Sequence, residues 1–347
     1  MNQTSLKDRL LLSTLPDEER ESGRRLLAAL GLVEGKLKQV EEELESRTRS
    51  AVPTIALIGD YLVEGGGKRI RPALLLLCAR LLGYQGRRDV LYAAVIELIH
   101  TATLVHDDII DLAETRRGRA SVNQRWGNEL TVLFGDHLYM KAMGIALDEG
   151  DLRVLKLLSD VTLAMTEGEI IGAERRGSID ISLTDYLDIV RRKTALLFGA
   201  SCRIPSYLLE EGDAYAEDLW DFGLALGIAF QLQDDLLDYT ATEKDLGKPV
   251  LSDLREGKLT LPLILSLPKV TRAERKLIET VVHEKGFTSV PAEKLLEIVD
   301  RTRSLTVARE MIDKYGEEAT QAAMRLPAVD SRDALLLAAQ YAASRRK

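Results

Sequence analysis

Two short segments that each contain three aspartates interrupt apolar stretches of this sequence. The first, VHDDIID, lies within ELIHTATLVHDDIIDLAETRRGR, and the second, QDDLLD, lies within GIAFQLQDDLLDY. Burying a carboxylate is costly unless the charge is paired or binds a metal. Any fold of this chain must therefore bring positive charge to two groups of side chains: the first aspartate motif, Asp107, Asp108 and Asp111, and the second aspartate motif, Asp234, Asp235 and Asp238.

Both motifs have the spacing of a helix face. Residues four apart lie on the same side of a helix, so the first and last aspartates of each motif are expected to project together. The middle aspartate of each motif points about 100° away. Two such faces turned towards each other would form a pocket whose carboxylates repel one another unless cations enter it.

The rest of the sequence also favours helices. Leu and Ala, which are good helix formers, dominate the chain, and few segments alternate in the manner of strands. Because long helices that are hydrophobic on much of their circumference pack into bundles, we predict an all-α fold with more than four helices. The predicted helices cover residues 72–83, 88–112, 120–148, 151–175, 184–208, 214–239 and 259–267.

The domain organisation is expected to be simple. No linker rich in Pro, Ser or Gly divides the chain, and 347 residues are enough to bury a large core. We therefore expect residues 1–347 to form a single domain. Residues 1–50 are charge-rich, with helical spacing from Leu26 to Leu44, and are expected to form a helical extension.

Composition argues against several classes of protein. The net charge of −8 disfavours a general role in nucleic-acid binding. Cys78 and Cys202 are far apart in apolar surroundings, so buried cysteines are expected rather than a disulfide or redox pair. The N-terminus is too charged for a signal peptide, and the longest apolar runs are far shorter than the ~20 residues that cross a bilayer. We expect a cytoplasmic protein without stable membrane insertion.

The aspartate motifs favour a hard metal ion. Neither motif has a nearby Cys or an obvious His pair, and His106 is expected to be a core residue rather than a ligand. Mg²⁺ usually takes one or two carboxylates and completes its octahedron with water and substrate phosphates. A solvated acidic helix face would explain one such motif, but two of them, each inside an apolar helix, favour metal binding.

Three clusters supply positive charge. They are GGGKRIRP, with Lys68, Arg69 and Arg71, then ETRRGR, with Arg116 and Arg117, and RRKTALLFG, with Lys193 and Thr194. Each cluster alone resembles ordinary surface charge, and GGGK lacks the spacing of a Walker loop. Together with two metal-binding faces, however, they suit two phosphate-bearing substrates, since Arg matches phosphate oxygens bidentately. The apolar interior suggests that the remainder of each substrate is hydrocarbon.

At these residues a family resemblance becomes apparent. The segments GGGKRIRP, ELIHTATLVHDDIID, RRG, KTA and FQLQDDLLDY...DLGKP follow the order found in trans-type polyprenyl diphosphate synthases. From about residue 50 to the C-terminus the sequence resembles that family, and within it the long-chain bacterial octaprenyl diphosphate synthases. The resemblance implies an all-α isoprenoid synthase bundle around a deep central cavity, usually a homodimer. It also implies Mg²⁺-dependent condensation of isopentenyl diphosphate onto an allylic diphosphate.

The resemblance further implies a role for particular residues. All six aspartates would serve two to three Mg²⁺ ions per active site: Asp107 and Asp111 at the allylic diphosphate, Asp234 from the opposite side, and Asp108, Asp235 and Asp238 in support. The isopentenyl diphosphate would be held by Lys68, Arg71, His100 and Arg117. The allylic diphosphate would be contacted by Arg116, Lys193, Thr194 and Gln231, and the later lysines Lys248 and Lys258 also match the family. The catalytic set would be Asp107, Asp111, Asp234, Lys193 and Arg116.

Residues just before the first motif limit chain growth in this family. Ala102 and Thr103 are small here, so the product would grow past them along the face of Ile99, Ile96 and Val95. Each helical turn adds ~5.4 Å, roughly one isoprene unit, and we expect roughly thirty to fifty carbons, with about forty favoured, as in quinone side chains. The candidates for the floor of the tunnel are Phe134, Tyr139, Met140 and Met143.

Two other functions remain open at this point. A class I terpene cyclase also combines a DDxxD motif with an all-α fold, but it does not need the second diphosphate site suggested by Lys68 and Arg71. A non-catalytic subunit of a heteromeric synthase, or a cation-binding helical scaffold, would not need both motifs intact. Incubation with farnesyl diphosphate alone would identify a cyclase, because a cyclase would convert it to hydrocarbon.

Overall fold

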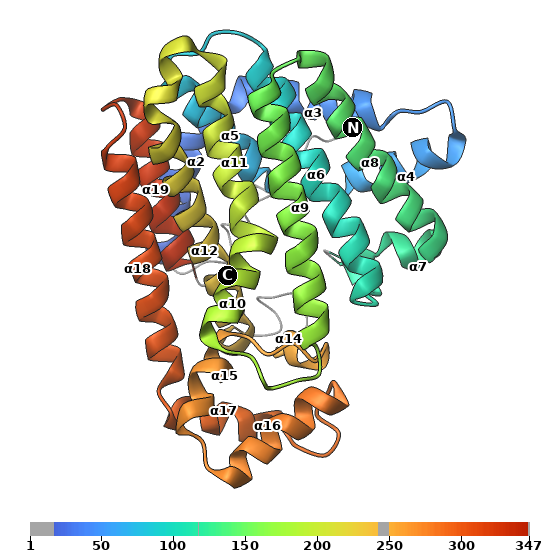
Figure 1. The fold of residues 1–347 in the computed structure, drawn as a ribbon, viewed down its shortest axis with the longest axis vertical. Coiled ribbons are helices and arrows are strands. Elements are labelled where there is room, and N and C mark those ends of the chain that lie inside the picture. Colours follow the sequence, from blue (N-terminus) through green and yellow to red (C-terminus); the bar gives the residue numbers. More distant parts are fainter. Residues whose placement is uncertain (1–16, 117, 242–249, 346–347) are drawn as a thin grey trace. The chain divides into compact units, whose positions relative to one another are not determined.

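The computed structural model of this protein describes residues 17–116, 118–241 and 250–345. These residues are almost entirely helical (Figure 1), and the only strands among them are β1 (Thr115–Arg116) and β2 (Arg119–Ala120), which form a small antiparallel hairpin. The predicted all-α class is confirmed. The first helices are α2 (Asp17–Leu30), α3 (Glu34–Thr48), α4 (Pro53–Glu64), α5 (Ile70–Leu81), α6 (Arg88–Ile110), α7 (Val122–Trp126), α8 (Asn128–Glu149) and α9 (Leu152–Arg175). The later helices are α10 (Leu183–Val190), α11 (Leu196–Arg203), α12 (Ala216–Thr240), α14 (Ser252–Arg255), α15 (Leu261–Ser266), α16 (Arg272–Glu284), α17 (Ala292–Arg301), α18 (Ser304–Met324) and α19 (Asp330–Ser344).

Backbone contacts divide the chain into two compact units. The first unit consists of Met1–Ser159, Ala200–Trp220 and Ala323–Ala338, and the second consists of Asp160–Gly199, Asp221–Ala322 and Ala339–Lys347. The first aspartate motif therefore belongs to the first unit and the second motif to the second unit. That residues 1–347 act as a single domain, and that both motifs face one cavity, stay predictions.

Helix α6 is the centre of the first unit. Nearly every residue from Asp89 to Ile99 is buried, and α6 packs most extensively against α8, with α5 and α3 also in contact. Among the described residues, Arg88–Ile110 is the one helix long and apolar enough to cross a membrane, and 67% of its apolar window is buried inside the protein. A helix that is apolar on all sides is expected in a core.

The core of the second unit gathers around α12. Leu232 and Leu236 of α12 pack in one cluster with Tyr186 of α10 and Leu261 of α15. Helix α10 begins at a capping box, in which the hydroxyl of Ser182 accepts the backbone N–H of Asp185 and the Asp185 carboxylate accepts the backbone N–H of Ser182. A capping box stabilises a helix start by satisfying otherwise unpaired N–H groups, so the sequence sets where α10 begins.

Two predicted helices are interrupted. The predicted helix 120–148 is divided at Gly127, whose φ of 82° is readily available only to glycine. The predicted helix 184–208 contains a π-helical turn, Arg191–Ala195, between α10 and α11, and it ends in the 3₁₀ turn Ile204–Leu208. The remaining boundaries agree with the predicted ones to within a few residues.

The two cysteines lie where they were expected. Cys78 and Cys202 are buried free thiols in the first unit. Burial raises the pKa of the Cys78 thiol well above its ordinary value, and the neighbouring Cys202 raises it further. A buried thiol of this kind is unreactive, so both cysteines act as small hydrophobic side chains.

Candidate active site

The first aspartate motif lies at the C-terminal end of α6. The helix ends at Ile110, and the backbone N–H of Asp111 still donates to the carbonyl of Asp107 at 2.8 Å, so these two half-buried aspartates lie on consecutive turns. The C-terminal end of a helix carries a partial negative charge. Two carboxylates at that end therefore add to the negative local potential and favour the binding of cations.

Asp108 has a protein partner. Its side chain is 2% exposed, and Nε and Nη2 of Arg116 each lie 2.7 Å from Asp108 Oδ1. The hairpin after α6 turns at Gly118, with φ of 74°, and pairs Arg116 with Arg119. The 100° offset of Asp108 points its carboxylate towards the hairpin and Arg116. The metal role of Asp108 and the substrate role of Arg116 stay predictions.

The inner aspartates of the second motif are also held by the protein. Asp235 is buried and accepts hydrogen bonds from the Tyr186 hydroxyl and from Gln231 Nε2, the latter at 2.9 Å. Asp238 is buried and accepts from the backbone N–H and hydroxyl of Ser252, at 3.1 and 2.8 Å, and from the backbone N–H of Asp253 at 3.1 Å. These hydrogen bonds fit the supporting role that the resemblance implies for Asp235 and Asp238, and that role stays a prediction.

Burial raises the pKa of Asp235 to about 6. The hydrogen bonds from Tyr186 and Gln231 oppose this shift, and the charges of Asp234 and Asp238 add to it. The sequence analysis missed Tyr186, because nothing in the segment DYLDIV indicates that its hydroxyl reaches a carboxylate 49 residues away.

Asp234 is more open than its neighbours. Its side chain is 44% exposed and forms an ion pair with Nη2 of Arg345, which also donates to the carbonyl of Phe230 at 3.2 Å. The guanidinium lies 4.0 Å from the centre of the Phe230 ring. The sequence analysis missed Arg345, although the basic run SRRK at the C-terminus was a signal that could have been used.

Thr194 and Gln231 form a directed chain of hydrogen bonds. The Thr194 hydroxyl donates to Gln231 Oε1 at 2.9 Å, while Gln231 Nε2 donates to Asp235. Because its proton is used in this way, the Thr194 oxygen is left to act as an acceptor. Lys193, the neighbour of Thr194, forms an ion pair with Glu169.

The π-helical turn that carries Lys193 and Thr194 is closely packed. A Cβ atom added at Gly227 would lie 2.7 Å from the Cα of Ala195, and one added at Gly168 would lie 2.6 Å from the Cβ of Arg192. These glycines allow α12 and α9 to approach the turn. π-helical turns are rare and are frequently found at functional sites.

The GGGKRIRP cluster separates into two kinds of residue. Arg69 is buried with φ of 50°, and it donates to both carboxylate oxygens of Glu41, at 2.9 and 3.1 Å, and to Glu97 at 2.7 Å. Burial alone would lower the pKa of Arg69, but the charges of Glu97 and Glu41 raise it above its ordinary value. Lys68 is exposed and Arg71 is half-buried, so these two are the members of the cluster that can reach a ligand.

The remaining predicted contacts are placed as follows. His100 is half-buried on α6, two turns before Asp107. Lys258 forms an ion pair with Glu256 at 2.7 Å. Arg117 and Lys248 lie outside the described residues.

The residues predicted to control chain length divide between interior and surface. Ala102 and Ile99 are buried, while Thr103 and Met143 are half-buried. Met140 is 61% exposed. The exposure of Met140 in the single chain gives no support to its predicted place at the tunnel floor, and the chain-length role of these residues stays a prediction.

A cavity lies on the other side of α6. It has a volume of about 70 Å³, and Thr101, Leu104 and Asp108 of α6 line it together with Tyr61 and Arg116. Thr101, Leu104 and Asp108 form one stripe of the helix, roughly opposite the stripe of Ile99 and Ala102 by the ~100° rotation per residue. This cavity is therefore distinct from the predicted tunnel.

The donor set fits a magnesium ion that arrives with its substrate. Among the described residues, no group of three or more His, Cys, Asp or Glu side chains is arranged to hold a metal alone. Mg²⁺ needs only one or two carboxylates when phosphates complete its coordination. Asp107 and Asp111 supply two carboxylates on adjacent turns of α6.

Comparison with known proteins identifies the family. The sequence profile of the polyprenyl synthetase family matches residues 52–299, which include both aspartate motifs, the GGGKRIRP cluster and the π-helical turn. The chain belongs to the polyprenyl synthetase family. The predicted family and the predicted class of prenyl-transferring enzyme are confirmed, and the match begins where the N-terminal extension was expected to end.

Individual members of the polyprenyl synthetase family are similar over most of the chain. Octaprenyl diphosphate synthase of Escherichia coli (strain K12) is 38% identical over 306 residues, which cover 88% of this chain and 94% of that protein. Heptaprenyl diphosphate synthase component 2 of Geobacillus stearothermophilus is 34% identical over 321 residues, covering 92% and 99%. The crystal structure of a decaprenyl diphosphate synthase from Rhodobacter capsulatus superimposes with a TM-score of 0.87 at 33% identity, covering 93% and 99%. The isoprenoid synthase fold is thereby confirmed.

Proposed function

We propose that this polyprenyl synthetase is a long-chain trans-polyprenyl diphosphate synthase. It would extend an allylic diphosphate, such as farnesyl diphosphate, by successive condensations with isopentenyl diphosphate to about thirty to fifty carbons. The observation that carries the proposal is the end of α6, where Asp107 and Asp111 stand above a buried apolar face that begins with the small residue Ala102. The octaprenyl and heptaprenyl names of the relatives support a long product.

Different side chains of the site would bind the metal ion and the substrates. Mg²⁺, when bound, would supply Lewis-acid stabilisation of the departing diphosphate. Asp107 and Asp111 would hold the ion, and Lys68, Arg71 and His100 would hold isopentenyl diphosphate. Because buried aspartates form strong hydrogen bonds in a low dielectric, Asp235 would fix the orientation of Gln231 and thereby that of Thr194.

The buried face of α6 would exclude water during the reaction. Ionisation of the allylic carbon–oxygen bond leaves a carbocation, which water would quench. Val95, Ile96 and Ile99 are all completely buried and carry no polar side-chain atoms. A dry apolar wall of this kind protects a reactive intermediate and also accommodates the growing hydrocarbon.

The protein is proposed to act as a homodimer. Helix α8 exposes Leu130, Leu133, Met140 and Leu147, which recur at intervals of three and seven residues. Recurrence of this kind forms one stripe along a helix and is typical of helix–helix interfaces. Met140→Glu is expected to convert a dimer to a monomer in size-exclusion chromatography with light scattering, whereas Lys141→Glu, one residue away, is not.

Product analysis tests the proposed reaction. The purified chain is incubated with farnesyl diphosphate, isopentenyl diphosphate and Mg²⁺, and the dephosphorylated products are separated by reversed-phase chromatography with mass detection. We expect a narrow set of all-trans polyprenols. Hydrocarbon from farnesyl diphosphate alone would instead identify a terpene cyclase, and no turnover would identify a non-catalytic subunit.

The proposed location and product use follow from the same chemistry. We propose a cytoplasmic enzyme whose hydrophobic product is delivered to a membrane for use as a quinone side chain. Fractionation of cells that express the tagged chain tests the location, because a stable membrane protein would sediment with the membranes.

A further inference from the structure

Helix α4 and the hairpin after α6 are joined through the side chain of Tyr61. The Tyr61 hydroxyl donates to the carbonyl of Ala120 at 2.7 Å, and Nη1 of Arg119 donates in return to the Tyr61 carbonyl at 3.3 Å. Nη2 of Arg119 also forms an ion pair with Glu64 at 3.2 Å. The last turn of α4 and the strand β2 are therefore held together by hydrogen bonds that run in both directions.

The ring of Tyr61 adds stacking contacts to these hydrogen bonds. The Arg119 guanidinium lies 4.1 Å from the centre of the ring, and the guanidinium of Arg125, from α7, lies 4.6 Å from it. Trp126 packs edge-on against the same ring, with 5.1 Å between the two centres. Cations over an aromatic face and edge-on aromatic pairs are both attractive. Tyr61 therefore connects three elements: α4, β2 and α7.

The hairpin depends on such outside contacts. Its strands β1 and β2 are two residues long each, and a two-stranded hairpin is at best marginally stable by itself. Arg116 of β1 pairs with buried Asp108 of α6. Arg119 of β2 is held instead by α4, through Tyr61 and Glu64. Since Tyr61 contacts both residues of β2, it is a main support for that strand.

The segment GGGKRIRP begins at the same residue. The backbone N–H of Gly65 donates to the Tyr61 carbonyl at 3.2 Å, where α4 ends, and a Cβ atom added at Gly65 would lie 3.6 Å from Arg119 Nη1. Lys68 follows three residues later. Tyr61, Gly65 and Arg119 also line the cavity of about 70 Å³ together. The segment GGGKRIRP and the hairpin therefore come together at Tyr61.

We infer that Tyr61 is a positioning residue for isopentenyl diphosphate. The inference rests on the proposed function, in which Lys68, Arg71 and Arg117 hold that substrate. Arg117 follows Arg116 of β1 directly in the sequence. A diphosphate needs cations on both sides at the right distance, and a misplacement of about 1 Å can cost about a hundredfold. By holding β2 against the end of α4, Tyr61 sets the distance between the two basic segments and acts through them rather than by contacting the substrate.

Steady-state kinetics of Tyr61 variants tests the inference. Tyr61→Leu removes the hydroxyl and the ring, and it is expected to raise the KM for isopentenyl diphosphate about tenfold with little change in kcat, because the groups that act on the departing diphosphate are unaltered. The KM for farnesyl diphosphate should change less, since Asp108 still holds Arg116. Tyr61→Phe keeps the ring and loses one hydrogen bond, so it should raise the KM for isopentenyl diphosphate only about two- to threefold.

Two arginine variants distinguish the hairpin contacts from the stacking on α7. Arg119→Met removes the hairpin side chain that contacts Tyr61 and should raise the KM for isopentenyl diphosphate as Tyr61→Leu does. The double variant should be no worse than either single one, because both changes remove the same interaction. Arg125→Met weakens the stacking on α7 but leaves the contacts to β2, so it should leave this KM unchanged.

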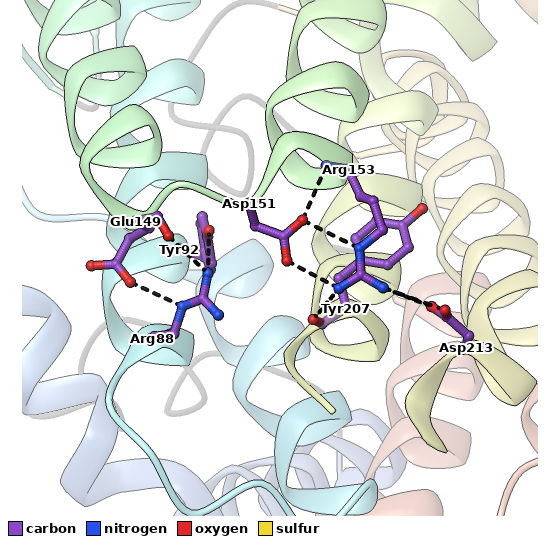
Figure 2. Close-up of polar contacts among 7 residues, drawn as sticks. All are labelled: Arg88, Tyr92, Glu149, Asp151, Arg153, Tyr207 and Asp213. Carbon is purple, nitrogen blue, oxygen red and sulfur yellow. Dashed lines mark hydrogen bonds and ion pairs between the residues drawn. The ribbon is translucent and has the colours of Figure 1, made fainter. Parts of the chain in front are cut away.

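Tyr207 provides a matched control in the first unit. Figure 2 shows Arg153 beside Tyr207: the guanidinium lies 4.9 Å from the centre of the ring, and Nη2 donates to the Tyr207 carbonyl at 2.8 Å. Arg203 lies 5.8 Å from the same ring. Tyr207 is thus contacted by two arginines as Tyr61 is, but these arginines belong to α9 and α11 rather than to the hairpin. Tyr207→Leu is therefore expected to leave the KM for isopentenyl diphosphate unchanged.

The outcomes separate this inference from the proposed function. If the wild-type chain elongates farnesyl diphosphate and Tyr61→Leu keeps the wild-type KM for isopentenyl diphosphate, or Tyr207→Leu raises that KM equally, the inference is overturned and the proposed function stands. If the wild-type chain makes no polyprenyl diphosphate, the proposed function fails and the inference fails with it. Circular dichroism verifies that each variant is folded. Should Tyr61→Leu not fold, Tyr61→Phe and Arg119→Met decide, and wild-type KM values in both overturn the inference.

Discussion

Arg69 offers a test of how the structure divides the GGGKRIRP cluster. It is a buried cation held by two carboxylates, Glu41 of α3 and Glu97 of α6. We propose to replace it with Met, which has a similar length and no charge. Glu41 is partly exposed and can be hydrated in the variant, but Glu97 is only 5% exposed and would be left as an uncompensated buried charge.

The expected loss of stability can be estimated in two ways. Removing one partner of a buried ion pair typically costs about 3–5 kcal/mol. The variant can also escape the buried charge by protonating the carboxyl, which for an ordinary glutamate costs about 3.7 kcal/mol at pH 7. We therefore expect Arg69→Met to lower the free energy of unfolding by about 3–4 kcal/mol.

The pH dependence gives a second measurement. Protonation of an ordinary glutamate costs only about 1.6 kcal/mol at pH 5.5. Since the variant is rescued by proton uptake, its deficit relative to the wild type should shrink as the pH falls from 7 to 5.5. Urea denaturation followed by circular dichroism at both pH values measures the difference.

Two further variants make the test specific. Adding Glu97→Leu to Arg69→Met removes the orphaned charge and should restore most of the stability, because an apolar pair often replaces a buried ion pair without loss. Lys68→Met alters the exposed neighbour and should change stability by less than about 0.5 kcal/mol, while raising the KM for isopentenyl diphosphate. A single Arg69→Met variant as stable as the wild type, or a double variant no better than the single one, would refute the reasoning.

The remaining predictions concern the site. Asp107→Ala and Asp234→Ala are each expected to lower kcat about a hundredfold or more, measured by steady-state incorporation of isopentenyl diphosphate; unchanged turnover would contradict their metal role. EDTA should abolish turnover and added Mg²⁺ restore it, whereas activity that persists in EDTA would exclude a divalent ion. Tyr186→Phe removes one hydrogen bond to buried Asp235 and should lower the free energy of unfolding by about 1–3 kcal/mol. It should also lower kcat with little change in the KM for isopentenyl diphosphate. A change in stability without a change in kcat would show that Tyr186 has only a structural role. Ala102→Tyr should shorten the product to about fifteen or twenty carbons, and an unchanged product would show that the tunnel lies elsewhere.

Local spacing was sufficient to predict much of the fold. The predicted helix 88–112 corresponds to α6, Arg88–Ile110, and Asp107 and Asp111 lie one turn apart as expected. These features could be predicted because helical periodicity depends on residues that are three or four apart in the sequence. The exceptions were the break at Gly127, where the backbone adopts a positive φ, and the π-helical turn, which packs closely against α12 and α9.

The partners of the charged residues were less predictable. Lys68 and Arg69 are adjacent and look alike in the sequence, yet one is exposed and the other is buried between two carboxylates. Asp108 pairs with Arg116 through a hairpin, and Asp234 pairs with Arg345, which is 111 residues away. The sequence analysis identified the need for positive charge but did not identify these partners within the protein.

The sequence by itself determined the helices, the side of each helix on which an aspartate or an apolar residue lies, and, through its motifs, the family. Only the tertiary structure decided which carboxylates are satisfied by the protein and that Met140 is exposed in the single chain. The physical reason is that a side chain's direction follows from local backbone geometry, whereas its partner depends on which distant segment packs against it.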